Sequence, residues 1–271
     1  MIRPSSNAPA LGTASAVRSR PEGDAALDIG AEQTPTLPIT GERTVPGVWH
    51  ENYWFRRHEA VYAAVAVELA GGCVLEAGCG EGYGAARLAA GGHNRVVALD
   101  YDPSAVSHVR RRYPDLPVVR GNLVALPFDD QTYDWVVSLQ TVEHLWDQDA
   151  FLAECRRVLR PGGRLVLSTP NRLTFPPGNV FHTTELSAEE LHALVDRHGG
   201  PSRLRGLRHG PELVEWERRH GSIVDAQLAA PPEDWSTELA DRVRQTGVDD
   251  FVLDETVSDA TLDLVAVVSF D

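Results

Sequence analysis

Four glycines and two acids lie close together in a pattern that suits the binding of a small cofactor. The segment from Glu76 to Gly84 reads EAGCGEGYG, which places glycine at positions 78, 80, 82 and 84. Glycine permits positive φ and, having no Cβ, lets a ligand approach the main chain. Glu81 stands among these glycines, and a carboxylate is a poor neighbour for a phosphate. The pattern therefore favours a cation over the pyrophosphate of a dinucleotide.

A further acid, Asp100, follows Gly80 by 20 residues and ends an apolar run. A carboxylate at the tip of a second strand can accept hydrogen bonds from both hydroxyls of a ribose. A nucleoside that carries no phosphate fits both the glycine segment and this acid.

Alternating apolar and amphipathic segments predict the elements that would position these residues. We expect helices near residues 83–90, 103–112 and 147–159. Strands this hydrophobic, separated by helices, indicate a parallel sheet covered on both faces. The expected strands cover residues 73–78, 95–100, 117–121, 133–139, 164–169, 203–209 and 262–270.

Segments before the core and an insertion near its end complete the predicted organisation. Residues 1 to about 45 are rich in Pro, Ser, Ala, Gly and Thr, which predicts a disordered tail before a domain over 46–271. An N-terminal helical segment is expected within 46–70, docked on the domain. An insertion at about 210–260 contains two expected helices, 212–219 and 237–246, and can serve as a cap or as a dimer interface.

The composition excludes several classes of function. A net charge of −14 would repel a nucleic-acid backbone, and the densest basic cluster, Arg110–Arg112, is only three residues long. All 25 basic residues are arginine, so chemistry that needs lysine, such as a pyridoxal-phosphate Schiff base or a Walker P-loop, is excluded.

The location of the protein is predicted from its cysteines and its apolar segments. Cys73, Cys79 and Cys155 show no Cys-x-x-Cys spacing and are expected to be reduced thiols. No signal-like start or membrane-length apolar stretch occurs in the sequence. We therefore expect a cytoplasmic protein without membrane insertion.

The ordered motifs resemble those of class I S-adenosylmethionine-dependent methyltransferases. The glycine segment 76–84, Asp100, GNLVALPF at 121–128 and LRPGGRLVLSTPN at 159–171 all match that family, over about residues 70–200. The resemblance implies a Rossmann-like, doubly wound α/β fold with a mostly parallel seven-stranded sheet and an antiparallel last strand. It also implies S-adenosyl-L-methionine as cofactor, contacted by Glu76, Gly78, Cys79, Gly80, Asp100, Tyr101, Asn122, Leu123 and Gln140.

One position departs from the family. Asn122 stands where the family usually has Asp beside the adenine. An amide both donates and accepts hydrogen bonds, so binding of the adenine edge is expected to survive the change.

The stretch after the expected fourth strand, SLQTVEHLWD at 138–147, should carry the chemistry, since ligands of open α/β sheets sit at the carboxyl ends of the strands. His144 is the candidate base for an alcohol acceptor, with Glu143 orienting it. The alternative is that His144 has no catalytic role and only caps a helix or orients a loop. Some members of the superfamily hold a divalent cation with Glu-x-x-Glu-His here, so Glu143, His144 and His182 are also candidate ligands for a metal such as Mg²⁺, although Gln140 replaces one carboxylate.

The fuller pattern resembles a narrower group. TGERTVPG, ENYWFRRHEAVY, EHLWDQ, STPN, FHTTEL and RHGSIVDAQ are similar to segments of the methyltransferases associated with mycobacterial methylglucose lipopolysaccharide and methylmannose polysaccharide. The resemblance implies O-methylation of a sugar hydroxyl, such as position 6 of glucose units in a cytoplasmic α-glucan. Tyr53, Arg57, His182 and His209 are the candidates for holding this oligosaccharide or polysaccharide acceptor. The aromatic and basic cluster that contains Tyr53 and Arg57 can equally serve only to anchor the N-terminal helix, and packing is the favoured role of its aromatic residues.

Two alternative functions remain open. A metal-assisted methyltransferase of a phenolic or quinone-like molecule is the main enzymatic alternative, and a non-catalytic module that binds the cofactor is another. A homodimer is compatible with the sequence, whereas a nucleic-acid partner is not expected.

Overall fold

The computed structural model describes residue 37, residues 43–200 and residues 202–270 of the 271-residue chain. The tail predicted over residues 1–45 falls mostly outside this range. Its described members Leu37, Thr44 and Val45 are buried, and Arg43 pairs with Asp102 at 2.8 Å. The end of the predicted tail therefore contributes contacts to the domain.

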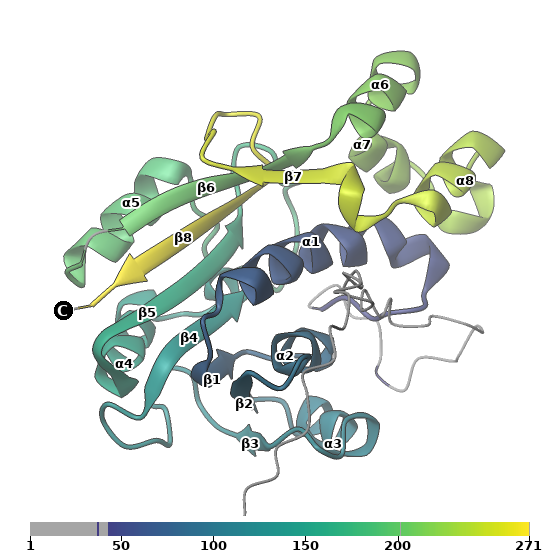
Figure 1. The fold of residues 1–271 in the computed structure, drawn as a ribbon. Coiled ribbons are helices and arrows are strands. Elements are labelled where there is room, and N and C mark those ends of the chain that lie inside the picture. The colour runs from purple at the N-terminus through teal and green to yellow at the C-terminus, as the bar shows by residue number, and fades with distance from the viewer. Residues whose placement is uncertain (1–36, 38–42, 201, 271) are drawn as a thin grey trace, which may run out of the picture. The chain divides into compact units, whose positions relative to one another are not determined.

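An eight-stranded sheet forms the centre of the described part of the chain (Figure 1). Its strand order is β3-β2-β1-β4-β5-β8-β6-β7, with β1 to β5 parallel and β8 antiparallel to both β5 and β6. The strands are β1 (Gly72–Ala77), β2 (Asn94–Asp100), β3 (Val118–Arg120), β4 (Tyr133–Leu139), β5 (Leu159–Pro170), β6 (Ser202–His209), β7 (Phe251–Asp254) and β8 (Asp263–Ser269). The predicted mostly parallel sheet with an antiparallel last strand is confirmed, and β7 adds an edge strand that was not predicted.

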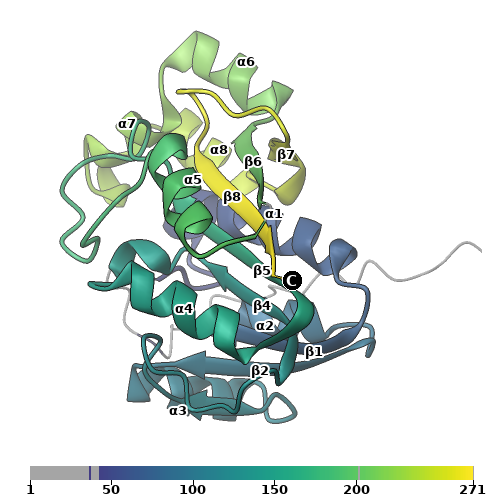
Figure 2. The same cartoon turned by 90° about the vertical axis from the view of Figure 1, so that its left-hand side faces the viewer.

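Helices cover both faces of this sheet (Figures 1 and 2). One face carries α1 (Asn52–Glu68), α2 (Tyr83–Ala89) and α3 (Pro103–Arg112), and the other carries α4 (Gln148–Val158) and α5 (Ala188–Arg197). Neighbouring strand residues point to opposite faces, so Val74 packs in the first apolar cluster and Leu75 in the second. This alternation explains why both faces need helices.

The insertion between β6 and β7 packs near the start of α1 (Figure 1). It contains the two expected helices, α6 (Pro211–His220) and α8 (Thr237–Gln245), together with an unexpected short helix, α7 (Ile223–Leu228). Asn52 joins α1 to the insertion, because its Nδ2 donates to the carbonyls of Val243 at 2.8 Å and Thr246 at 2.9 Å. No described helix has the length and apolar character needed to cross a membrane.

Candidate active site

The glycine segment connects β1 to α2. Some of its glycines leave room for side chains of the protein, and one leaves room for a ligand. A Cβ on Gly78 would lie 2.5 Å from Thr141 Oγ1, and one on Gly84 would lie 2.2 Å from Tyr62 Cζ. These two glycines make room for side chains of the protein itself. Gly80 has φ +52°, and a Cβ placed on it would have its nearest neighbouring atom 3.8 Å away. Gly80 therefore borders open space in the cavity that it lines.

Asp100 is held at the tip of β2 by two backbone donors. Its Oδ2 accepts from Gly80 N at 2.7 Å and its Oδ1 from Asp102 N at 2.8 Å. Burial raises the pKa of this carboxyl, and the two N–H groups act in the opposite direction. These bonds fix the carboxylate at the edge of the cavity above the loop.

This first cavity has a volume of about 480 Å³, enough for a nucleoside-sized ligand. Among its lining residues are eight of the predicted cofactor residues: Gly78, Cys79, Gly80, Asp100, Tyr101, Asn122, Leu123 and Gln140. These residues lie at or just after the carboxyl ends of β1, β2, β3 and β4. The structure therefore brings them together around one cavity.

Glu76, the ninth predicted cofactor residue, does not line the cavity. It is fully buried, accepts from Tyr62 OH at 2.5 Å, and its pKa is raised to about 8 by burial. Tyr62 does line the cavity. Glu76 thus supports the wall from behind, and the prediction of a direct contact is corrected.

Glu81 also has partners inside the protein. Its Oε1 accepts from His108 Nε2 at 2.7 Å and its Oε2 from Tyr113 OH at 3.0 Å, both groups belonging to or following α3. The carboxylate ties the glycine loop to α3, so the expectation that it serves a bound cation is not needed to explain its presence.

A second cavity of about 400 Å³ adjoins the first. Its apolar wall includes Trp54, Phe175 and Leu228, and its polar groups include Glu51 and Asn179. Both cavities are lined by Arg43, Thr44, His58, Gln140 and His144, which we call the junction. A group passed from a ligand in one cavity to a ligand in the other must cross this junction.

Gln140 introduces the turn that follows β4. It is one of two described non-glycine residues with positive φ, at +51°, and its N–H donates to Ser168 O at 3.0 Å. A left-handed residue of this kind is uncommon and is often found at functional sites. The turn brings the next residues, through His144, back toward both cavities.

Glu143 and His144 lie on a 3₁₀ turn, Val142–His144, directly after this bend. His144 Nδ1 lies 2.9 Å from the carbonyl oxygen of Phe181, so Nδ1–H donates there and the neutral ring carries its lone pair on Nε2. Nε2 lies 3.9 Å from Glu143 Oε1. Burial raises the pKa of Glu143 to about 8.

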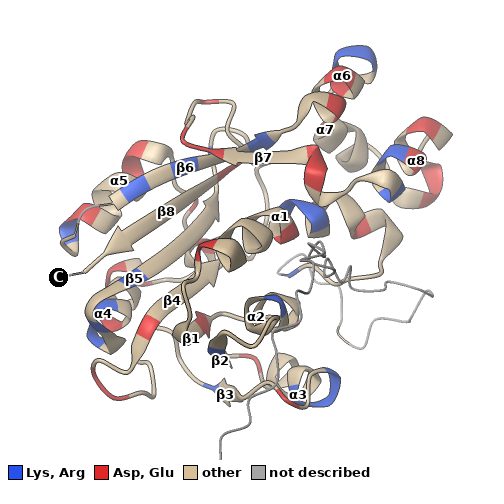
Figure 3. Ribbon diagram, in the orientation of Figure 1, with Lys and Arg blue, Asp and Glu red and all other residues tan. Residues whose placement is uncertain are grey.

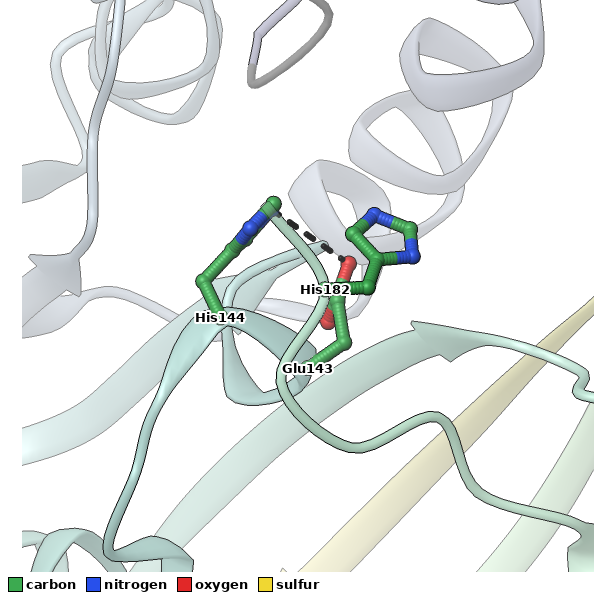
Figure 4. Close-up of side chains that lie close together, drawn as sticks. All are labelled: Glu143, His144 and His182. Carbon is green, nitrogen blue, oxygen red and sulfur yellow. Dashed lines mark ion pairs between the residues drawn. The ribbon is translucent and has the colours of Figure 1, made fainter. Parts of the chain in front are cut away.

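His182 completes the cluster drawn in Figure 4, where the Glu143 carboxylate lies between the two imidazole rings. The rings of His144 and His182 have centroids 4.9 Å apart. His182 Nδ1–H donates to Glu185 Oε1 at 2.7 Å, and its Nε2 accepts from Asn179 Nδ2 at 3.1 Å. One potential ligand atom from each of Glu143, His144 and His182 lies within 4.8 Å of the others.

Three of the predicted acceptor residues line neither cavity. Tyr53 OH lies 2.8 Å from His209 Nε2, and Arg57 forms a buried ion pair with Asp263 at 2.6 Å. Tyr53 and Arg57 on α1 thus reach His209 at the end of β6 and Asp263 at the start of β8, which joins α1 to the sheet. Tyr53, Arg57 and His209 therefore lie outside both cavities, and the packing alternative describes Tyr53 and Arg57 better, while His182 lines the second cavity.

The fold and the cavity above its glycine loop define an α/β protein of the methyltransferase type. A solved methyltransferase of Thermotoga maritima, described as a possible histamine N-methyltransferase, matches with a TM-score of 0.58 and 16% identity, over 82% of this chain and 95% of that chain. At this identity the likeness shows the fold alone.

Sequence comparisons identify the family. A methyltransferase domain model matches residues 75–167. A probable S-adenosylmethionine-dependent methyltransferase of Mycolicibacterium smegmatis is 50% identical over 243 residues, which cover 85% of this chain and 94% of the relative. A phthiotriol/phenolphthiotriol dimycocerosates methyltransferase of Mycobacterium leprae is 37% identical over 205 residues, covering 73% and 70% of the two chains. The chain belongs to the S-adenosylmethionine-dependent methyltransferases, and S-adenosyl-L-methionine is its cofactor.

Proposed function

We propose that the protein transfers the methyl group of S-adenosyl-L-methionine to a hydroxyl of a saccharide. The observation that carries the proposal is the junction, where His144 presents Nε2 between a cavity suited to the cofactor and a second cavity. The cofactor occupies the first cavity, with Asp100 at its ribose and Asn122 at its adenine. The acceptor occupies the second cavity.

The proposed reaction is an in-line displacement. The acceptor oxygen attacks the methyl carbon, a C–O bond forms, and the C–S bond breaks with its electron pair passing to sulfur, which leaves a neutral thioether. The hydroxyl proton passes to His144 Nε2, whose orientation is fixed by the Nδ1–H bond to Phe181 O. The protein contributes alignment and proton removal.

The lining of the second cavity supports a sugar as acceptor. Trp54 and Phe175 offer flat apolar surfaces, with ring centroids 6.1 Å apart, and Glu51, Asn179 and His182 add polar groups. Such a mixture suits a ring that carries both C–H faces and hydroxyls. With the sequence resemblance to sugar methyltransferases, this supports 6-O-methylation of glucose units in methylglucose lipopolysaccharide synthesis as the specific form of the proposal.

An acceptor screen with radiolabelled cofactor tests this function. We expect label on gluco- or manno-oligosaccharides, and none on catechols or on long-chain alcohols. Label confined to catechols would favour the phenolic alternative. Label confined to the alcohols would favour a lipid acceptor, in keeping with the name of the M. leprae relative.

Replacing the base tests the mechanism. His144→Ala should lower kcat by about 10²–10⁴-fold while the cofactor Kd measured by calorimetry stays within a few-fold of wild type. An unchanged kcat would overturn the role of His144. A protein that binds cofactor but methylates none of the acceptors would support the non-catalytic alternative.

A divalent metal held by Glu143, His144 and His182 is the second candidate for activating the hydroxyl. Glu143 is 1% exposed and its Oε2 has no hydrogen-bond partner among the described residues. Each histidine donates through Nδ1 to an oxygen, as metal-bound histidines commonly do. Metal binding through His182 Nε2 would displace its contact with Asn179. Two imidazoles and one carboxylate suit Zn²⁺ or a similar transition metal better than Mg²⁺, which prefers oxygen ligands.

Metal titration separates the base from the metal centre. If a metal is bound there, calorimetry of the chelator-treated protein should show binding of Zn²⁺ or Mn²⁺ that His182→Ala weakens by at least about 10-fold. Full activity after chelation, with no heat from Zn²⁺, Mn²⁺ or Mg²⁺, would leave His144 as the base without a metal.

A further inference from the structure

We propose that His58 positions the acceptor by donating a hydrogen bond from Nε2 to the hydroxyl oxygen that receives the methyl group. This inference rests on the proposed transfer to a hydroxyl. It assigns a role to a residue on α1 that lines both cavities.

The placement of His58 leaves one ring nitrogen for a ligand. Nδ1 lies 3.4 Å from Thr44 Oγ1, and Nε2 has no hydrogen-bond partner among the described residues. His144 and Gln140 reach the junction from the turn after β4, whereas His58 reaches it from α1. The two histidines therefore belong to different elements that meet where the methyl group must cross.

A short polar chain is compatible with the tautomer of His58 that the proposal requires. Tyr83 OH lies 3.0 Å from Thr44 Oγ1, and both residues are buried. With Tyr83 donating to Thr44 and Thr44 donating to His58 Nδ1, the hydrogen of the neutral imidazole resides on Nε2. Burial lowers the pKa of His58 to about 4; the charge of Asp263 opposes this shift, and the charge of Arg57 adds to it. A neutral donor adds no positive charge beside a sulfonium.

The geometry of an alcohol explains what a second histidine would do. The oxygen carries one hydrogen and two lone pairs. In the proposed reaction the hydrogen points to His144 Nε2 and one lone pair points to the methyl carbon. The other lone pair is left to accept a hydrogen bond, and a donor there fixes the rotation of the hydroxyl about its C–O bond.

Two substitutions distinguish this role from a structural one. The amide nitrogen of Gln reaches about as far as Nε2, whereas the amide of Asn reaches about as far as Nδ1. His58→Gln should keep kcat/KM for the methylated acceptor within a few-fold of wild type, and His58→Asn should lower it on the order of 10–100-fold. The cofactor Kd and the shape of the pH profile should stay unchanged in both variants. His93→Asn, at an exposed residue that lines neither cavity, is the matched control.

The opposite order of effects would overturn the inference. If His58 serves only Thr44, His58→Asn should retain activity and His58→Gln should lose it, with a weaker cofactor Kd because Thr44 lines the first cavity. Equal activity of the His58→Asn variant and the wild-type enzyme would also overturn it, as would parallel losses of activity and Tm in both variants. A wild-type protein that methylates no hydroxyl refutes the proposed function itself, whereas an active wild type with unaffected variants refutes only the role of His58.

Discussion

At the scale of single residues, two buried carboxyls lie beside the cavities and have strongly raised pKa values. Burial raises the pKa of Glu76 and of Glu143 to about 8 each. Glu76 supports Tyr62 behind the first cavity, and Glu143 lies beside His144. Charging either group in the folded protein is unfavourable, so both link stability to pH.

We predict that Glu76→Gln reduces the pH dependence of stability. The folded-state pKa lies above the ordinary value of 4.5, so the folded protein binds more protons and loses stability as pH rises from about 4.5 to about 8. Glutamine keeps an acceptor for Tyr62 OH and cannot ionise. Its advantage over wild type should grow across that window to as much as roughly 4 kcal/mol, measured by urea unfolding at each pH.

The remaining slope of this variant should come partly from Glu143. Adding Glu143→Gln should flatten the profile further, whereas Glu212→Gln, at an exposed residue, should leave the wild-type profile unchanged. Parallel curves of unfolding free energy against pH for the wild type and Glu76→Gln would contradict the prediction. They would show that ionisation of Glu76 does not destabilise the folded protein.

Residue types and spacing selected cofactor candidates that lie together in the structure, but acceptor candidates that mostly do not. Glycines and an acid at strand ends are positioned by the sheet itself, and all the predicted cofactor residues except Glu76 line one cavity. Candidates on α1 depend on which helix face turns inward. Successive helical residues differ by about 100°, so Arg57 points to Asp263 while the adjacent His58 reaches the junction.

At the scale of elements, the start of α1 holds the insertion in place. Asn52 Nδ2 donates to the carbonyls of Val243, Arg244 and Thr246, at the end of α8. Helix ends leave carbonyls without intrahelical partners, and the Asn52 amide supplies a donor to them here; Val243 O accepts from Thr246 N–H at 3.3 Å as well. The helix that carries His58 is thereby joined to the insertion.

We predict that Asn52→Ala destabilises the protein by about 1–2 kcal/mol, because these carbonyls lose a partly buried donor. Hydrogen exchange should accelerate in α8 and remain near wild type in β1 and β4. Asn52→Asp, which keeps the size but removes the donors, should be at least as destabilising. An unfolding midpoint identical to wild type in both variants would contradict this function of Asn52.

The elements that were missed carry weak or conflicting signals. The strand β7 has four residues and, among the described strands, pairs with β6 alone, so its formation depends on a sheet edge that the sequence does not reveal. The helix α5 begins with a capping box between Ser187 and Glu190, which is the sequence signal that predicts a helix start there. The long apolar runs of β1, β4 and β8, by contrast, indicated strands directly.

At the scale of the described molecule, the charges gather away from the centre of the sheet. Figure 3 shows β8 uncharged along most of its length, while α6 and α8 carry both acidic and basic residues. Several of these pair locally, as Glu215 does with Arg218 at 2.8 Å. Exposed pairs of this kind contribute little to stability.

The two cavities reach the surface beside different residues. Tyr101 and Trp146, which line the first cavity, are 66% and 78% exposed, and Leu228, which lines the second, is 59% exposed. Under the proposed function, a spent cofactor can thus leave the first cavity while a long saccharide stays in the second. With several modifiable positions on one chain, we expect processive turnover: under excess cofactor, mass spectrometry should detect multiply modified chains while most of the acceptor is still unmodified.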